Sequence, residues 1–189
     1  MISCIKLLGD GSHALSASGD RTIKLWDVEQ QRAIISMAGH GREIFCCDTD
    51  RNDPSGVGGN LIISGGRDKT ARVWDRRTGN CEHVLVGHTG TVVCLRFDDM
   101  LLATAGGYAR ADDNEQITGV DNSVRLWDLR MLSRSAGGQT PIVSMVDQYP
   151  NAHPPINQDG DPVLHVDIQP GVIVSAHADH AIRIWDCGL

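Results

Sequence analysis

The chain has 189 residues, of which 41% are hydrophobic and 22% charged, so it is long enough and apolar enough to fold around a sizeable core. Its formal net charge of −7 argues against the concentrated basic surface that nucleic-acid binding needs, so we expect no nucleic-acid partner. The sequence has no run near eighteen apolar residues, so we expect no membrane partner and a place in the cytoplasm, the nucleus or both.

Short runs rich in apolar and β-branched residues, separated by clusters of Gly, Asn, Asp and Pro, predict β-strands along the whole chain. They fall into four groups. The first group is 2–8, 13–17, 22–27 and 32–37, and the second is 43–47, 61–64, 71–75 and 81–86. The third is 92–97, 101–105, 123–129 and 142–146, and the fourth is 163–168, 172–176 and 181–186.

One twelve-residue sequence motif recurs in each group, from a Ser or Thr on the second strand to a Trp-Asp pair on the third. Its clearest copies are 16–27, 64–75 and 175–186, and the third copy is interrupted by a long insert between Gly107 and Val120. All four tryptophans of the chain hold the same position in this motif, and an aspartate lies six residues before each. A fixed place for every tryptophan in an array of repeats indicates a structural role.

Four units that end in Trp-Asp, two of them preceded by the Gly-His pairs 39–40 and 87–88, resemble WD repeats. This family forms β-propellers, in which each repeat is a blade of four antiparallel strands around a central channel. The resemblance implies an all-β propeller in one partial domain, an open or incomplete ring of four visible blades whose last blade lacks its fourth strand. The blades are expected at about 1–37, 39–86, 87–146 and 159–189, with a proline-rich link at 147–162.

In the family, a histidine, a Ser or Thr, an aspartate and the tryptophan form a buried hydrogen-bonded set in each blade. The resemblance implies complete sets in repeats two and three: His40, Ser64, Asp68 and Trp74, and His88, Thr104, Asp121 and Trp127. Repeat one supplies Ser16, Asp20 and Trp26, and repeat four supplies Ser175, Asp179 and Trp185 without an obvious histidine. The sets resemble a catalytic triad in composition alone, so we expect no enzyme activity and no cofactor. The spacing of the six cysteines gives no metal site, and we expect four of them to be small buried hydrophobes: Cys4, Cys46, Cys47 and Cys94.

The predicted strands leave open edges at both ends of the array, which are a liability in β proteins. We therefore expect the sequence to be a fragment of a longer propeller. Two alternatives are self-association that completes the ring and an open arc of four blades.

The resemblance implies a protein-binding scaffold whose partners bind the top face, where the second-to-third turns and the blade-to-blade links meet. The inserts 106–120 and 147–162 should neighbour each other there, and they are the best candidates for specificity. The alternative is a substrate receptor of an F-box ubiquitin ligase, because Arg67 matches the arginine with which those propellers hold a phosphorylated motif. Arg42 should lie near Arg67, and Arg110 in the first insert is a further candidate contact. At the position of Arg67, the other repeats have Gly19, Val120 and Ala178.

Overall fold

The computed structural model describes residues 1–50, 60–98, 100–110, 117–130, 142–144, 162–169 and 171–186. These residues form four antiparallel sheets and one added hairpin. Within the described part of the chain, no helix has the length and apolar character that a membrane crossing requires.

Each sheet is one blade, and its strands follow one another in sequence order. Blade 1 contains β1 (Ile2–Leu7), β2 (His13–Ser18), β3 (Thr22–Asp27) and β4 (Arg32–Ala38). Blade 2 contains β5 (Ile44–Thr49), β6 (Leu61–Gly66), β7 (Thr70–Asp75) and β8 (Cys81–Val86). Blade 3 contains β9 (Val92–Phe97), β10 (Leu101–Gly106), β13 (Val124–Asp128) and β14 (Ile142–Ser144). Blade 4 contains β15 (Val163–Gln169), β16 (Val172–His177) and β17 (Ile182–Asp186).

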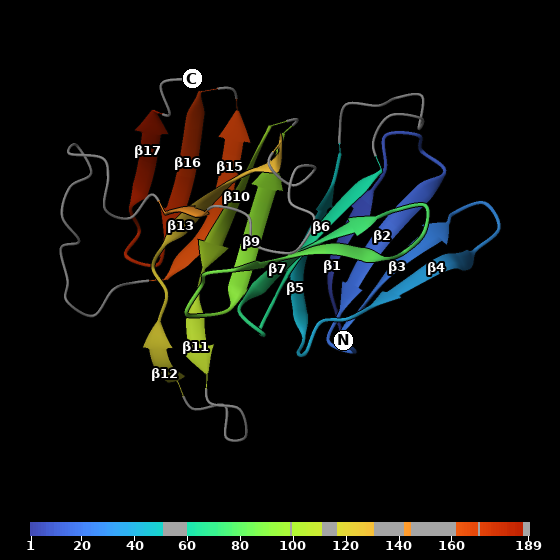
Figure 1. Ribbon diagram of the computed structural model, residues 1–189, viewed down its shortest axis with the longest axis horizontal. Coiled ribbons are helices and arrows are strands. Elements are labelled where there is room, and N and C mark those ends of the chain that lie inside the picture. The colour runs from blue at the N-terminus through green and yellow to red at the C-terminus, as the bar shows by residue number, and fades with distance from the viewer. Residues whose placement is uncertain are drawn as a thin grey trace.

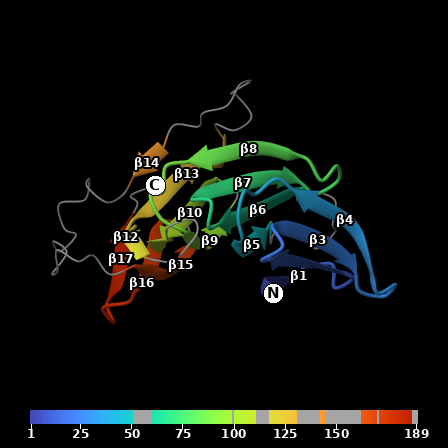
Figure 2. The same cartoon turned by 90° about the horizontal axis from the view of Figure 1, so that it is seen from below.

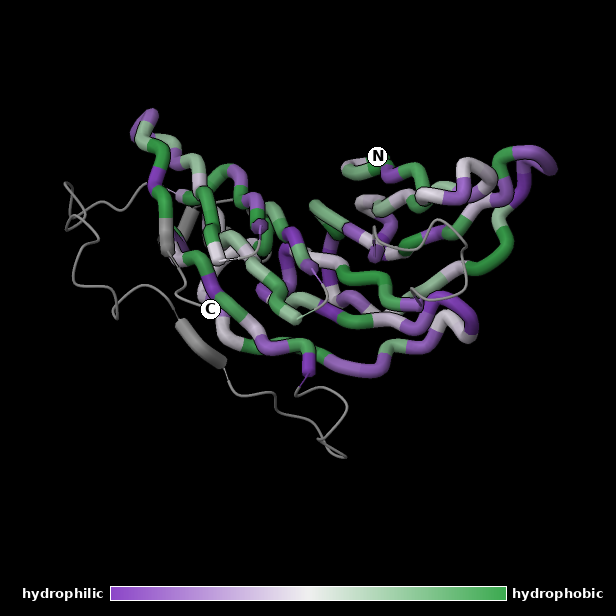
Figure 3. The backbone as a smooth tube through the Cα atoms, turned by 90° about the horizontal axis from the view of Figure 1, so that it is seen from above, coloured by the Kyte–Doolittle hydropathy of each residue, from purple (hydrophilic) through white to green (hydrophobic). Residues whose placement is uncertain are grey.

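The four blades stand side by side in an arc (Figure 1). Their first strands, β1, β5, β9 and β15, contact one another in that order along the inner side of the arc, and β4, β8 and β14 lie towards its outer side (Figure 2). Seen from above, the arc is open between blade 1 and blade 4 (Figure 3). The all-β propeller architecture is thereby confirmed, with an open ring and a last blade of three strands among the described residues.

Apolar clusters fill the space between each pair of neighbouring blades, because every inner sheet buries one face on the preceding blade and the other on the following one. Cys46, Cys47 and Cys94 are buried in these clusters, as expected of small hydrophobes. Cys4, which was expected to be buried with them, is only partly buried at the edge of its cluster. The largest members are Trp74 between blades 1 and 2 and Trp127 between blades 2 and 3.

The observed strands begin and end within two residues of the predicted ones, with one exception in blade 3. There the insert forms an antiparallel hairpin of β11 (Tyr108–Arg110) and β12 (Ile117–Val120), two strands that were not among those predicted from the sequence. The hairpin extends beyond the sheet, at the bottom of Figure 1. Of the insert 147–162, only Pro162 lies within the described residues.

Candidate functional site

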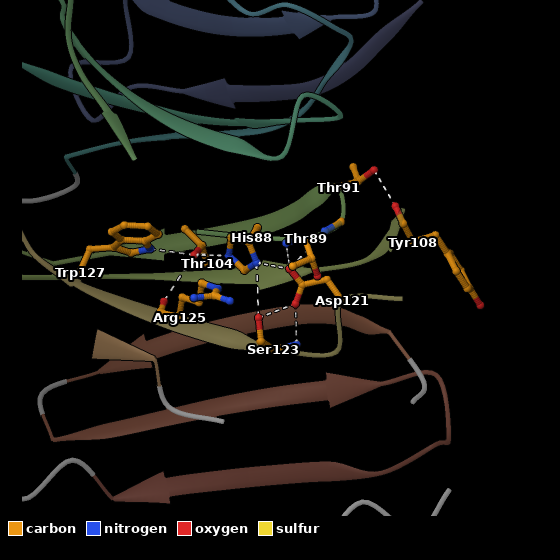
Figure 4. Close-up of polar contacts among 10 residues, drawn as sticks. His88, Thr89, Thr91, Thr104, Tyr108, Asp121, Ser123, Arg125 and Trp127 are labelled. Carbon is orange, nitrogen blue, oxygen red and sulfur yellow. Dashed lines mark hydrogen bonds and ion pairs between the residues drawn. The ribbon is translucent and has the colours of Figure 1, made fainter. Parts of the chain in front are cut away.

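Blades 2 and 3 each contain a chain of hydrogen bonds that runs from the tryptophan to the turn aspartate. In blade 2 the Trp74 indole N–H donates to Ser64 Oγ at 2.8 Å, and Ser64 Oγ lies 2.7 Å from His40 Nε2. His40 Nδ1 lies 2.8 Å from Asp68 Oδ2. Blade 3 repeats the chain at 2.9, 2.7 and 2.8 Å with Trp127, Thr104, His88 and Asp121 (Figure 4).

The carboxylate of Asp68 determines which groups donate and which accept in the hydrogen bonds of blade 2. Asp68 can only accept, so the Nδ1–H of His40 donates to it, and Nε2 on the other side of the ring pairs with the Ser64 hydroxyl. Ser64 Oγ then accepts the indole N–H of Trp74, so this hydroxyl satisfies two buried partners at once. Burial by itself would raise the pKa of Asp68, but the hydrogen bond from His40, the electrostatic attraction of that ring, and the hydrogen bonds from the neighbouring turn and link outweigh it and lower the pKa to about 2.

The turn aspartates also join each turn to the link that enters the blade. Asp68 Oδ2 accepts the backbone N–H of Gly41 at 2.9 Å, and Asp121 Oδ2 accepts that of Thr89 at 2.7 Å. In blade 3, burial opposes ionisation, but the hydrogen bonds from His88 and Ser123 hold the pKa of Asp121 well below its usual range. The buried sets therefore fix the geometry of the loops above them.

Two glycines leave the space that the hydrogen-bonded sets of blades 2 and 3 occupy. Gly66 and Gly106 hold equivalent positions, two residues after the second-strand hydroxyl. A Cβ atom on Gly106 would lie 2.4 Å from Asp121 Cγ, and one on Gly66 would lie 3.0 Å from His40 Nδ1. A larger residue at this position is therefore compatible only with a different arrangement of the set.

Blade 4 has such a different arrangement, and it corrects the expectation that this repeat has no obvious histidine. His177 replaces the glycine, and its Nε2 lies 2.9 Å from Ser175 Oγ. Arg183 Nη1 lies 2.5 Å from His177 Nδ1, and Arg183 Nη2 lies 3.0 Å from Asp179 Oδ2. Because a guanidinium can only donate, the ring of His177 is neutral and its Nε2–H donates to Ser175. The side chain of Trp185, on β17, lies outside the described part of the chain.

Blade 1 keeps two parts of the set. The Trp26 indole N–H donates to Ser16 Oγ at 2.9 Å, as the tryptophans of blades 2 and 3 do to their hydroxyls. Asp20 holds its own turn by accepting from the backbone N–H of Thr22 at 3.0 Å and from the Thr22 hydroxyl at 2.6 Å.

The histidine sets are poorly suited to catalysis. Ser64 and Thr104 are fully buried, and each hydroxyl already bonds both an indole and an imidazole. A nucleophile must instead be open to a substrate on one side. No group of three or more potential metal ligands occurs among the described residues.

The open part of the molecule is the rim where the turn between the second and third strands of each blade meets the link that enters that blade. One backbone hydrogen bond joins turn and link in every blade: Gly19 to Met1, Arg67 to Glu43, Gly107 to Thr91, and Ala178 to Pro162. We call this surface the top rim; it lies at the bottom of Figure 1.

The β11–β12 hairpin is the largest described feature of the top rim. The Tyr108 carbonyl accepts from both the backbone N–H and the hydroxyl of Thr91, at 3.1 and 2.9 Å. The Tyr108 side chain is partly exposed and points away from the buried set (Figure 4). The hairpin is thus anchored to the blade at its base and presents an aromatic side chain to solvent.

The three arginines singled out from the sequence differ in their surroundings. Arg67 lies on the top rim, with its side chain 13% exposed and its Nη1 3.5 Å from Glu43 Oε2. Arg42 is half-buried on the neighbouring link. Arg110 is on β11, and its side chain lies outside the described residues. The contact of Glu43 with Arg67 was not predicted from the sequence, because Glu43 directly follows Arg42 but matches no motif.

A model of the family described as WD domain, G-beta repeat matches residues 1–27, 31–75 and 79–128. WD repeat-containing protein 37 of Xenopus tropicalis is 29% identical over 178 residues, which are 93% of this chain and 29% of that protein. DENN domain and WD repeat-containing protein SCD1 of Arabidopsis thaliana is 27% identical over 187 residues, 98% of this chain and 13% of that protein. The chain therefore spans less than a third of the length of these curated relatives.

Solved structures share the fold at lower sequence identity. The WD40 beta propeller domain of Doa1 has a TM-score of 0.65 and 20% identity, over 97% of this chain and 50% of that one. The computationally designed Ika4 protein has a TM-score of 0.68 and 18% identity, over 98% of this chain and 91% of that one.

Proposed function

Because the chain belongs to the WD-repeat family, whose members generally act as scaffolds for protein interactions, we propose that it is a non-catalytic scaffold that binds other proteins on its top rim. The rim combines a stable base with loops of individual sequence. Rigid scaffolds of this kind commonly carry their binding residues on such loops.

The observation that carries this proposal is the anchored β11–β12 hairpin. Blades 1 and 2 connect their second and third strands by short turns, whereas blade 3 has the insert 106–120 at the same place. The hairpin begins directly beside the link into blade 3, to which Thr91 ties it. An exposed tyrosine on an anchored segment suits protein recognition, because its ring offers apolar contact area and its hydroxyl a hydrogen bond.

The chain itself offers a design for the test. Deleting 108–120 leaves Gly107 between Gly106 and Asp121, which is the spacing that Arg67 has between Gly66 and Asp68 in blade 2. We expect this variant to keep the fold and to lose partners that the intact chain captures, measured by quantitative affinity capture. The matched control deletes 51–58 from the connection between β5 and β6, which leaves the top rim unchanged. Equal capture by all three chains would contradict the proposal.

Reading of a phosphorylated motif by Arg67 is the alternative function, and the structure gives it less support. The carboxylate of Glu43 already pairs with Arg67 and would repel a phosphate. On this alternative, Arg67→Ala abolishes binding of a phosphopeptide and leaves its unphosphorylated form unaffected. On the scaffold proposal, Arg67→Ala changes the binding of both peptides equally or not at all.

A further inference from the structure

Cys4 and Cys47 bring two thiols together across the junction of blades 1 and 2. Cys4 lies on β1 and Cys47 on β5, and these two inner strands lie side by side (Figure 2). Cys4 Sγ is 3.5 Å from the Cys47 carbonyl oxygen, and the Cys4 side chain packs against the apolar cluster that contains Cys47. The two thiols also hydrogen-bond to each other. The contact lies inside the array, with both sides of its junction in the described chain.

The other two junctions of the described chain do not place one cysteine against another. One register position on the first strand holds a cysteine in three blades: Cys4, Cys46 and Cys94. The residue after this position on β5, β9 and β15 faces the preceding blade, and it is Cys47, Leu95 and Val166, respectively. A cysteine of one blade therefore faces a cysteine of the next blade only between blades 1 and 2 of the described arc.

The surroundings of this pair favour a negative charge on Cys4. The hydrogen bond from the Cys47 thiol, more than any other contact, lowers the pKa of the Cys4 thiol to about 6, although burial opposes it. The ammonium of Lys6 acts in the same direction, and Asp48, which pairs with Lys6 at 3.5 Å, acts against it. The hydrogen bond to Cys4, together with burial, raises the pKa of the Cys47 thiol well above its usual range. At neutral pH the pair therefore holds a thiolate at Cys4 and a thiol at Cys47.

We propose that Cys4 and Cys47 form a site of reversible oxidation, at which hydrogen peroxide joins blade 1 to blade 2 through a disulfide. The thiolate is the form of cysteine that reacts with peroxides, and the sulfenic acid that it gives condenses with a neighbouring thiol. The disulfide ties β1 to β5 on the inner side of the arc. Dithiol reductants restore the two separate thiols by exchange.

The two steps balance with hydrogen peroxide as the oxidant. The Cys4 thiolate attacks one peroxide oxygen, the O–O bond breaks, and the hydroxide that leaves takes up the proton that the Cys4 thiol had released. Cys4 is now a neutral sulfenic acid, so the negative charge that helped to raise the pKa of Cys47 is gone. The Cys47 sulfur then attacks the Cys4 sulfur, and the S–O bond breaks as the S–S bond forms. The second hydroxide takes the Cys47 proton, so two thiols and one peroxide give one disulfide and two waters.

Peptide mapping of the oxidised chain tests the proposal directly. The reduced, folded chain is treated with hydrogen peroxide, its remaining thiols are blocked with N-ethylmaleimide, and trypsin then releases peptides 1–6 and 43–51. We expect mass spectrometry to find these two peptides joined after peroxide and separate after dithiothreitol. Absence of the joined pair after peroxide would overturn the proposal.

Two variants identify the partner of Cys4. Peptide 43–51 contains both Cys46 and Cys47, so Cys47→Ala should abolish the joined pair, whereas the matched control Cys46→Ala should retain it. A joined pair that persists in Cys47→Ala would show that the proposal is wrong.

The rate at which iodoacetamide alkylates Cys4 tests the role of Cys47 before oxidation. We expect the rate to follow a midpoint near the pKa of Cys4, about 6, and this midpoint to rise in Cys47→Ala because the thiol that hydrogen-bonds to the Cys4 sulfur is gone. Cys46→Ala should leave the midpoint in place. An unchanged midpoint in Cys47→Ala would contradict the activation of Cys4 by Cys47.

Discussion

Ser64→Ala tests whether the buried hydrogen-bond chain of blade 2 holds the fold together. The change removes one hydroxyl and leaves two buried groups without their partner, the Trp74 indole N–H and His40 Nε2. An orphaned buried polar group costs about 1–3 kcal/mol, so with two such groups we expect the free energy of unfolding to fall by about 2–6 kcal/mol. That loss is a large part of the usual stability of a domain.

Ser16→Ala is the matched comparison in blade 1. Ser16 accepts the same indole bond at 2.9 Å, but Trp26 is partly exposed, so water can replace the hydroxyl. We expect a loss of about 0.5–1.5 kcal/mol for this variant. Ser64→Thr retains a hydroxyl, as in blade 3, and should be clearly more stable than Ser64→Ala.

Urea unfolding at neutral pH, followed by both tryptophan fluorescence and circular dichroism, measures these differences, and coincident transitions justify a two-state fit. Losses that are equal for Ser64→Ala and Ser16→Ala within about 0.5 kcal/mol would refute the reasoning, since the two orphaned groups of blade 2 would then cost nothing extra.

Two further predictions concern the turn aspartates. The folded pKa values of Asp68, about 2, and of Asp121, lower still, lie below the unfolded value of about 3.9, so their stabilisation is complete above about pH 4 and is lost as the pH falls towards 2. Urea midpoints measured from pH 5 downward should fall in that window, and a flat profile would contradict the assignment. Gly106→Ala should destabilise the protein by about 1–3 kcal/mol, because the added Cβ would lie 2.4 Å from Asp121 Cγ. Gly66→Ala, with its nearest atom at 3.0 Å, should cost less in the same assay, and the reverse order would show that the Asp121 site relaxes freely.

The sequence was sufficient to place residues whose separation is set within one hairpin. Ser64 and Trp74 lie on adjacent antiparallel strands, so their spacing in the chain fixes which face they share and how close they lie. The histidine comes from the preceding link, and in repeats two and three it lies 14 residues after the tryptophan of the preceding repeat. This is why His40 and His88 could be proposed from the sequence.

His177 could not be found in that way, because it reaches Ser175 from within the same strand. The available signal was the loss of the glycine that repeats two and three have as Gly66 and Gly106. Its meaning depends on the distance from that position to the neighbouring aspartate, which only the structure shows.

The β11–β12 hairpin was missed for a different reason. Its strands have three and four residues, below the length at which alternation of apolar and polar residues is informative. The ion pairs between blades were equally hidden, since their members belong to no sequence motif: Lys6 with Asp48, and Arg96 with Asp48 and Asp167. Contacts between blades depend on how separate sheets pack, and spacing within one repeat does not determine them.

The central claim is that the buried sets support the fold, whereas the top rim binds partners. It is tested most directly by measuring both partner capture and the urea midpoint of the chain that lacks 108–120. We predict that partner capture falls sharply while the urea midpoint stays that of the intact chain. Undiminished capture by the deleted chain would contradict the claim.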